Sequence, residues 1–436
     1  MKNSGLSLKI GFWPLVSLVI SAQLGASIFF MPAQIAKFRT LGLFGWGIGG
    51  LGAVLITFVF SFLCTKTAKV GGPHIYAKMF FGEKIGFFVT WIYWCGAWAC
   101  NPIIIAVSIN YLMSLTGDLS ACTKLALEVL LVISLTLVNV MGLRTTSTVE
   151  TILTVFKVLP LIMIPVLAFP NINLEHFSEF TGPGMSSVDT LTQAAIFSFW
   201  AFVGLEGGTS PAAVVKNPKK TIPLAIVSGT ATVALISIIN TIAAFGIVEP
   251  SGLENEGAPL AKILLVLFDG RSFDKLIGGI TFIMCYGSLN AWVFFSGQIA
   301  KSAAVERIFP GVFGKLNKRG VPGNALWISA AGTIVILFLQ KSPWFADKIE
   351  KFVDMSVVIY ISMYFMAICA YIKFMLQTKL KFVSHIIITM LALLFCSFVL
   401  FKTEIMNFSA LIIMLLTGIP IYMFVRKNAK SGNLPV

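Results

Sequence analysis

The chain has 436 residues, of which 57% are hydrophobic and only 11% charged, and its mean hydropathy is +0.91. Soluble proteins are about 45–50% apolar and about 25% charged, and no folded interior could hide this excess of apolar side chains. The composition therefore excludes a soluble enzyme, a secreted disulfide scaffold and, despite a formal net charge of +14, a nucleic-acid-binding protein. Most of the chain must face lipid.

Apolar runs bounded by charges or by Gly and Pro clusters predict about twelve membrane-spanning helices, since each span needs roughly 20 apolar residues. We place them at residues 11–36, 41–63, 85–114, 124–143, 150–170, 190–211, 222–247, 276–300, 324–340, 352–376, 383–401 and 406–425. The second span contains Gly45-Trp46-Gly47-Ile48-Gly49-Gly50, which has the spacing of a dinucleotide-binding loop. Because no strand precedes it, we interpret this stretch as a helix-packing face.

The first and sixth spans carry Gly-rich interruptions that a regular helix does not tolerate well. The interrupting residues are Gly25-Ala26-Ser27 in the first span, and Gly204, Gly207, Gly208 and Pro211 in the sixth. Paired broken helices in corresponding places are typical of transporters with inverted repeats. A broken helix offers free N–H groups to a carboxylate and free carbonyls to an ammonium, so the pattern predicts a receptor for a zwitterionic amino acid.

Three ionisable residues remain inside the predicted spans, where each costs a few kcal/mol unless it faces a polar interior. Glu128 is within one turn of its helix start, and we expect it to reach the outer interface. Lys157 lies about seven residues into its span: either it snorkels to the inner interface, or it is a buried, titratable cation. Glu206 adjoins the second break, which indicates a binding site or a gate; the alternative is a structural pairing with another helix.

The arrangement of basic residues predicts the orientation. Segments on the same side as the N-terminus contain 21 basic residues and three acids, one of them Glu150 at the start of the fifth span. Segments on the opposite side contain ten basic residues and thirteen acids. Because cytoplasmic loops are rich in Lys and Arg, we predict a multi-pass protein of the cytoplasmic (inner) membrane with both termini in the cytoplasm.

Several motifs resemble those of the amino acid–polyamine–organocation transporter superfamily, in its basic amino acid/polyamine antiporter branch, and most of all those of arginine/agmatine antiporters. They are GASIFFMPA, GGPHIYAKMFFG, YWCGAWACNP, WAFVGLEGGTSPAAVVKNPKKTIP and GSLNAWVFFSGQIAKSAA followed by FPGVFGKLNKRGVP. The resemblance implies an all-α membrane protein of twelve helices with a LeuT-like 5+5 inverted repeat and broken helices 1 and 6. Residues 1–436 would form one transporter domain, with repeats at 11–170 and 190–376 and two additional helices at 383–425. It also implies a homodimer.

The resemblance further implies roles for individual residues. One group of residues would bind the substrate, and a second group would gate its passage. The substrate group is Gln23, Ala26, Ser27, Ile28, Ala97, Asn101, Trp200, Val203, Trp292 and Ser356; the gating group is Tyr93, Glu206 and Tyr364. Lys157 resembles the proton-coupling lysine of other permeases in the superfamily. His74 replaces a Tyr often found at its position, and it is either a cytoplasmic pH sensor or a loop histidine with its bonds satisfied.

These features predict a secondary transporter, not an enzyme. The first hypothesis is exchange of amino acids, cationic ones above all, and their decarboxylated amines; the alternative is a proton-coupled amino acid symporter that uses Lys157. Both bind a small molecule and need no cofactor. A membrane enzyme or a channel is disfavoured because the three histidines lie apart, in loops or at span edges, and the seven cysteines show no metal-ligand spacing.

Overall fold

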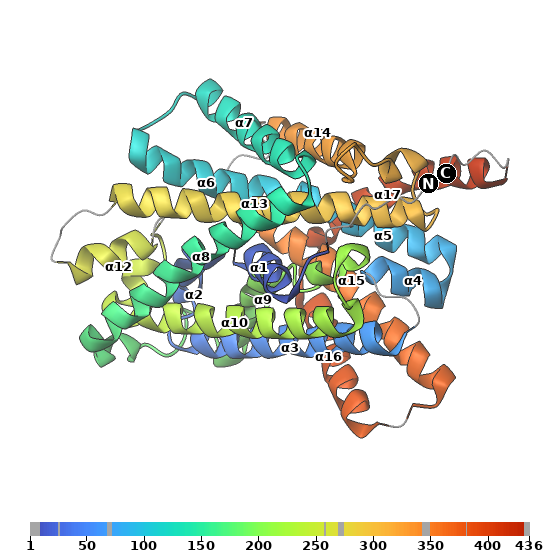
Figure 1. Cartoon of the computed structure of the whole chain (residues 1–436). Helices are drawn as coiled ribbons and strands as arrows, with labels where there is room; N and C mark the ends of the chain where they lie inside the picture. The colour runs from blue at the N-terminus through green and yellow to red at the C-terminus, as the bar shows by residue number, and fades with distance from the viewer. Residues whose placement is uncertain are drawn as a thin grey trace.

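The computed structural model describes residues 9–24, 27–67, 72–256, 259–268, 274–341, 349–380 and 382–430. Figure 1 shows a bundle of long helices with several short ones packed between them. In chain order the α-helices are α1 (Phe12–Gln23), α2 (Ser27–Ala36), α3 (Leu41–Lys66), α4 (Pro73–Phe81), α5 (Glu83–Ala99), α6 (Asn101–Thr116), α7 (Ala121–Val140), α8 (Leu143–Ala168), α9 (Ser187–Phe199), α10 (Pro218–Ile247), α11 (Pro250–Leu253), α12 (Pro259–Leu267), α13 (Asp274–Val305), α14 (Gly323–Gln340), α15 (Ile349–Thr378), α16 (Val383–Lys402) and α17 (Ser409–Lys430).

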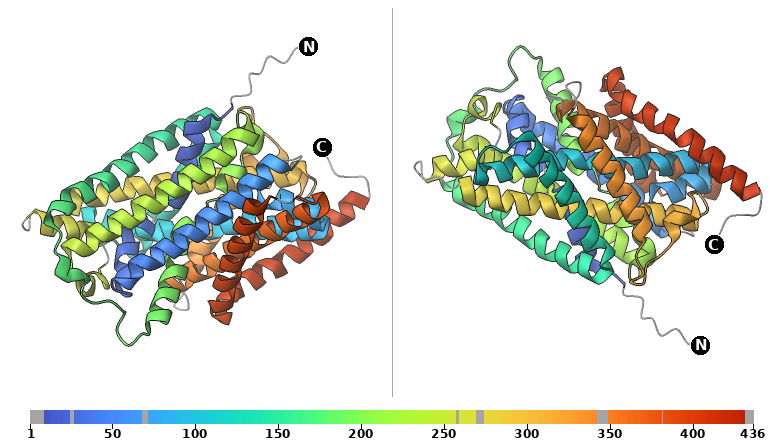
Figure 2. Two further views of the ribbon diagram at one scale, coloured as in Figure 1. Left: turned by 90° about the horizontal axis from the view of Figure 1, so that it is seen from below. Right: turned by 90° about the horizontal axis from the view of Figure 1, so that it is seen from above.

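The periphery of the bundle is apolar. Eleven helical segments in the described ranges are long and apolar enough to cross a membrane, and the first predicted span is formed by the two short helices α1 and α2. Large apolar side chains are widely exposed, for example Phe401 at 88%, Ile405 at 87% and Leu376 at 75%. Both views of Figure 2 show the last helix, α17, at the edge of the bundle. Such apolar faces are stable only against lipid, so the prediction of an all-α membrane protein is confirmed.

Helix α1 lies in the centre of the bundle, where it packs against α8, α10 and α13 (Figure 1). Helix α3 packs closely on α9, because glycines replace side chains at the contact. A Cβ atom at Gly45 would be 2.4 Å from Ala194 Cβ, and one at Gly49 would be 2.4 Å from Ser198 Oγ. The interpretation of this glycine-rich stretch as a packing face is confirmed.

Both predicted breaks are present. Helix α1 ends at Gln23 and α2 begins at Ser27; Gly25 and Ala26 lie outside the described residues. Helix α9 ends at Phe199, and the chain then runs through short 3-10 turns as far as Val214. Gly204 has a φ of +100°, a backbone conformation that favours glycine. The second part of span six is therefore a series of turns, without the α-helical second half that the sequence predicts.

Prolines create a further break. The sequence predicts the third span as one helix, but it divides at Cys100 into α5 and α6. Pro102 has no N–H for the carbonyl of Trp98, which instead accepts a hydrogen bond from Thr333 Oγ1 at 3.0 Å. In α8, Pro165 likewise leaves the Leu161 carbonyl free, and Asn240 Nδ2 donates to it at 2.8 Å. Side chains from neighbouring helices thus satisfy the backbone inside the membrane.

The two broken spans are tied together at both ends. Ile10, just before α1, donates to the carbonyl of Val214 at 2.7 Å, and Lys216 donates to the carbonyl of Ile10 at 2.9 Å. At the other end, the N–H of Leu41 donates to the carbonyl of Phe180 at 2.9 Å. Leu41 is the first residue of α3, just after the first broken span, and Phe180 precedes α9. The fold therefore joins the start of one broken span to the end of the other. The inverted repeat and the domain boundaries stay predictions.

Candidate functional site

A small cavity lies between the two broken spans. It has about 40 Å³ of free space, enough for a few water molecules. The side chains and backbone that line it belong to Ala22, Gln23, Cys100, Asn101, Ile104, Trp200, Val203, Trp292, Ser356 and Tyr360. Six of these ten are predicted substrate residues: Gln23, Asn101, Trp200, Val203, Trp292 and Ser356. The other four were missed, although each is adjacent to a predicted residue or one helical turn from it.

The carbonyl end of α1 lies at this cavity. Helix ends leave carbonyls without intrahelical partners, and here side chains of other helices donate to them. Trp292 Nε1 donates to the carbonyl of Ala22 at 3.2 Å, and Ser288 Oγ donates to that of Leu24 at 3.0 Å. Lys157 Nζ is 3.4 Å from the carbonyl of Ser21. The end of α1 therefore attracts hydrogen-bond donors, including one ammonium group.

Two indole rings form walls of the cavity. Trp200 Nε1 donates to Ser356 Oγ at 3.1 Å, and the Trp292 ring lies 5.5 Å from the Tyr360 ring between centroids. Because each indole N–H is bonded to another part of the protein, the rings are held in place. The face of an indole attracts cations. The Trp200 carbonyl, predicted to accept the substrate ammonium, accepts the N–H of Val203 at 3.1 Å in this conformation.

The predicted gating residues lie next to the break in span six. Glu206 is fully buried and accepts a hydrogen bond from the hydroxyl of Tyr364. The same hydroxyl accepts the N–H of Gly204 at 3.3 Å. The third gating residue, Tyr93, is 2.7 Å from Ser210 Oγ and also interacts with the carboxylate of Glu206. Glu206 and Tyr364 thus act as one unit that stabilises the break, and neither lines the central cavity.

Lys157 is fully buried, so the snorkelling alternative is wrong for this conformation. Its ammonium donates to the hydroxyl of Ser21 on α1 and, at 2.8 Å, to that of Ser288 on α13. A Cβ at Gly287 would be 2.8 Å from Lys157 Cε, so a glycine makes room for the lysine stem. The ammonium therefore connects α8 and α13 to the carbonyl end of α1.

A comparison with family models matches the amino acid permease family over residues 10–425, nearly the whole chain. The chain belongs to the amino acid permease family. It is a multi-pass membrane transporter and not an enzyme. The prediction of an amino acid–polyamine–organocation transporter is confirmed at this level.

Two characterised relatives are similar along most of this permease. The putrescine transporter PotE of Haemophilus influenzae is 26% identical over 369 residues, which cover 84% of this chain and 85% of that protein. The cadaverine/lysine antiporter of Escherichia coli strain K12 is 26% identical over 395 residues, which cover 89% of this chain and 88% of that protein. Both names place this permease near the basic amino acid/polyamine antiporters.

The remaining predicted substrate residues lie around the first and third spans. Ala26 is outside the described residues, and Ser27 begins α2. Ile28, in the first turn of α2, is 2% exposed. Ala97 is buried in α5 but does not line the central cavity. The roles of these four residues stay predictions.

Sequence reasoning missed a buried acid of the permease. Glu150, assigned above to a cytoplasmic segment, lies two turns inside α8 and is fully buried. Its Oε2 accepts from Asn290 Nδ2 at 2.6 Å, and Asn290 Oδ1 accepts from Asn139 Nδ2 at 2.9 Å. Glu150 is seven residues before Lys157, so both project from the same face of α8. This spacing is the signal in the sequence that could have revealed it.

Two other charged pairs are structural. The Glu128 carboxylate is buried and not at an interface as the sequence predicts. Its two oxygens lie 2.9 and 3.1 Å from Nζ of Lys341, the residue that follows α14. Arg39, which follows α2, is 4% exposed and pairs with Glu179 at 2.5 Å and Glu254 at 2.7 Å. These pairs hold helices and loops together away from the cavity.

His74 lies in helix α4, so its predicted place in a loop is wrong. The ring is fully buried, with Nε2 3.0 Å from Ser302 Oγ, and Nδ1 has no hydrogen-bond partner in the described part of the chain. Burial lowers the pKa of His74 to about 4, although the charge of Glu306 opposes this shift. The ring is therefore neutral at pH 7 here. Sensing of neutral pH would need a conformation in which the ring is exposed.

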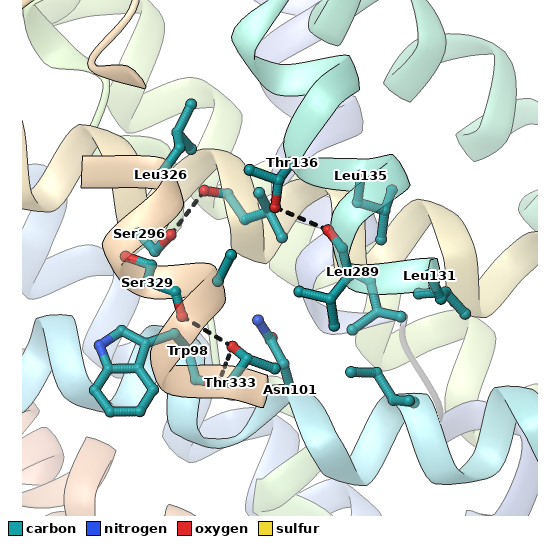
Figure 3. Close-up of a pocket in the computed structure, with 14 residues that line it drawn as sticks. Trp98, Asn101, Leu131, Leu135, Thr136, Leu289, Ser296, Leu326, Ser329 and Thr333 are labelled. Atoms are coloured by element: carbon teal, nitrogen blue, oxygen red, sulfur yellow. Dashed lines mark hydrogen bonds between the residues drawn. The ribbon is translucent and has the colours of Figure 1, made fainter. Parts of the chain in front are cut away.

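A second small cavity also has Asn101 in its lining (Figure 3). It has about 10 Å³ of free space, and α5, α6, α7, α13 and α14 contribute to its walls. Hydroxyls around it donate to backbone carbonyls, such as Thr136 to Val132 and Ser296 to Val293, both at 2.8 Å (Figure 3). Asn101 therefore lines both cavities. In the described ranges, no group of three His, Cys, Asp or Glu residues could hold a metal ion.

Proposed function

We propose that this permease exchanges cationic amino acids and polyamines across the cytoplasmic membrane by alternating access, in arginine/agmatine-type fashion. The observation that supports this proposal most is the central cavity between the two broken spans, with the carbonyl end of α1 on one side and the faces of Trp200 and Trp292 around it. Putrescine, cadaverine and lysine, named in the two relatives, are methylene chains that carry amino groups. Apolar stems and ammonium heads are what indole faces and helix carbonyls attract.

In the proposed complex, the α-ammonium or one end of a diamine lies at the carbonyls of Gln23, Trp200 and Val203. The N–H groups of Ser27 and Ile28, at the start of α2, and that of Ala26, the residue before them in the chain, receive the carboxylate of an amino acid. Trp200 and Trp292 enclose the methylene chain. Asn101 and Ser356, which also line the cavity, contact its far end. The resemblance to arginine/agmatine antiporters gives Tyr93, Glu206 and Tyr364 their role as gates.

Loading requires a conformational change. The central cavity has about 40 Å³ of free space, less than a molecule of lysine occupies. The walls therefore must move apart before substrate enters. The ties of Ile10 to Val214 and of Leu41 to Phe180 lie at opposite ends of the broken spans, so opening at either end would involve a different tie.

Counterflow in proteoliposomes tests the exchange. Vesicles that contain the full chain are loaded with unlabelled lysine, arginine, agmatine, putrescine or cadaverine, and entry of labelled lysine or putrescine is followed without a pH gradient. We expect uptake at least tenfold above that of vesicles loaded with buffer. Equal uptake in loaded and empty vesicles would contradict exchange. The loading compound that gives the fastest uptake identifies the substrate.

Proton-coupled symport is the second candidate, because Lys157 is buried among Ser21 and Ser288 beside the end of α1. A cation in this position can link its proton to the conformation of α1. Vesicles without internal substrate should then accumulate labelled substrate when a pH gradient is imposed, and Lys157→Ala should abolish this accumulation. Uptake that depends only on internal substrate would favour exchange.

The orientation and the assembly follow the same proposal. Both termini would lie in the cytoplasm, and the functional unit would be a homodimer, as the resemblance implies. Labelling of single cysteines at the termini in intact cells tests the orientation. Mass photometry of the purified protein in detergent tests the dimer.

A further inference from the structure

The fully buried Glu150 has no role in the function proposed so far. It lies two turns inside α8, and a carboxylate in such a place is costly unless it is paired or protonated. Asn290 donates to its Oε2, whereas Oε1 has no hydrogen-bond partner among the described residues. Buried carboxylate oxygens usually have a hydrogen-bonded or ionic partner, and this oxygen has neither among the described residues. Glu128, which has two contacts to Lys341, is the structural acid of the same molecule.

Lys157 is the charged side chain that interacts with Glu150. The two residues are seven positions apart, so they lie on one face of α8 with about 10 Å of helix rise between them. The Ser21 and Thr154 hydroxyls lie between them: Ser21 Oγ accepts from Lys157 Nζ, and Thr154 Oγ1 is 3.3 Å from Ser21 Oγ. Both hydroxyls are near enough to the Glu150 carboxylate to interact with it, although neither makes a hydrogen bond of standard geometry to Oε1 in this conformation. A ladder of hydroxyls thus connects the ammonium to the carboxylate.

Other charges around this pair are few. Helices α1, α7, α10, α12 and α13 pack against α8. In the part of the chain that the structure describes, the titratable groups that interact with Lys157 are Glu150 and the thiol of Cys285 on α13. The partner of Glu150 is Lys157. The other polar neighbours, such as Asn290, Ser21 and Thr154, are neutral, so each member of the pair is the main source of charge for the other.

We propose that Glu150 is the proton-exchange partner of Lys157 and delivers the proton of that lysine to the end of the bundle where α8 begins. An N–H bond of the ammonium breaks, an O–H bond forms at the carboxylate, and the hydroxyls of Ser21 and Thr154 carry the proton across. The pair is neutral in sum before and after the transfer, so the buried site gains no net charge. Loss of the ammonium charge weakens its bonds to Ser21 and Ser288, and this frees the end of α1. The inference rests on the proton-coupled mode of the proposed function.

The test compares Glu150→Gln with Glu128→Gln in the full-length protein. Both variants neutralise a buried acid, and in Glu150→Gln the new amide oxygen can still accept from Asn290. Two quantities are measured in proteoliposomes with labelled lysine or putrescine: uptake driven by an imposed pH gradient, and counterflow without a gradient. We expect Glu150→Gln to lower the gradient-driven uptake at least tenfold and to leave counterflow within threefold of wild type. Glu128→Gln should reduce neither quantity more than threefold.

A second variant covers the case in which Glu150→Gln does not fold. Asn290→Ala keeps the carboxylate of Glu150 but removes the amide that donates to it. Because this donor stabilises the ionised carboxylate, its loss favours the protonated form. The pH at which gradient-driven uptake is half-maximal should then rise by at least half a unit. An unchanged half-maximal pH in Asn290→Ala would overturn the inference.

Other outcomes overturn the inference as well. One is that Glu150→Gln takes up substrate along the pH gradient as fast as the wild type. Another is that Glu150→Gln loses gradient-driven uptake and counterflow to the same extent, which would make Glu150 structural. Wild-type counterflow without any response to the gradient would overturn the inference but leave the exchange proposal intact. Absence of both activities in the wild type would overturn the proposed function itself.

Discussion

The two broken spans use opposite means to stabilise an interruption inside the membrane. At the end of α1, carbonyls receive donors from other helices: Trp292, Ser288 and the ammonium of Lys157. In span six, the chain mostly satisfies itself with tight turns, and Tyr364 joins the N–H of Gly204 to the carboxylate of Glu206. One break is therefore held by a cation from outside, and the other contains its own anion.

This difference indicates how the two breaks respond to change. The end of α1 depends on the protonation and position of side chains that belong to α8 and α13. The break in span six depends on its own backbone conformation and on one tyrosine. We therefore expect charge substitutions to act most strongly at the first break and steric substitutions at the second.

The largest expected effect is that of Lys157→Ala. It removes the ammonium from the α1 carbonyls and leaves Glu150 as a buried charge without its partner, which costs about 3–5 kcal/mol of folding stability. Thermal unfolding in detergent should show a large drop in Tm. Lys262→Ala is the control, because Lys262 and its partner Glu256 are both about one-third exposed, and an ion pair in water contributes little. A similar drop in both variants would contradict a special role for Lys157.

Gly204→Ala tests the backbone of the second break. Its φ of +100° disfavours any side chain, and the new Cβ would be 2.9 Å from the Trp292 ring. We expect a loss of about 2–4 kcal/mol from strain and overpacking, together with at least a tenfold fall in counterflow. Gly47→Ala should be neutral in both measurements, because the new Cβ would have no atom of another described element within 4 Å. If counterflow by Gly204→Ala were as fast as that of the wild type, the Trp292 ring would have to move aside freely, and the prediction would be wrong.

Tyr364→Phe tests the polar unit at the same break. Without the hydroxyl, the Gly204 N–H and one oxygen of Glu206 lose their partner, which should cost about 1–3 kcal/mol. Tyr360→Phe is a matched control on the same helix, because its hydroxyl has no hydrogen-bond partner among the described residues. Thermal unfolding of the two variants should differ clearly. Equal Tm values would mean that the hydroxyl of Tyr364 does not stabilise the break.

The smallest expected effect is at His74, away from both breaks. Burial lowers its pKa from 6.5 to about 4, so the folded state binds fewer protons than the unfolded state between these values. Stability is then complete above pH 6.5 and decreases as the pH falls toward 4. In His74→Gln this contribution disappears. Between pH 7.5 and 5.5, the free energy of unfolding should therefore fall by about 1 kcal/mol less in the variant than in the wild type. Parallel Tm–pH curves for wild type and variant would contradict the prediction.

The sequence predicts the helices well, but it assigns some polar residues wrongly. The ninth predicted span, 324–340, differs by one residue from α14, because apolar length and flanking charges are local properties. The sequence places Glu150 at a cytoplasmic edge, since the apolar run begins after it, whereas α8 begins at Leu143. It likewise places His74 outside a helix. A polar side chain at a span edge has no local signal that tells whether another helix covers it.

The amino-acid sequence by itself determined that lipid surrounds this chain, that about twelve segments cross it, and that two of them are interrupted. Hydropathy, glycine and proline act through neighbours along the chain, so they can be evaluated without a fold. Only the tertiary structure decided that Lys157 bonds to Ser21 and Ser288, that Glu150 lies on the same buried face, and that Asn101 lines two cavities. These relations join helices far apart in sequence, and the packing of whole helices sets them.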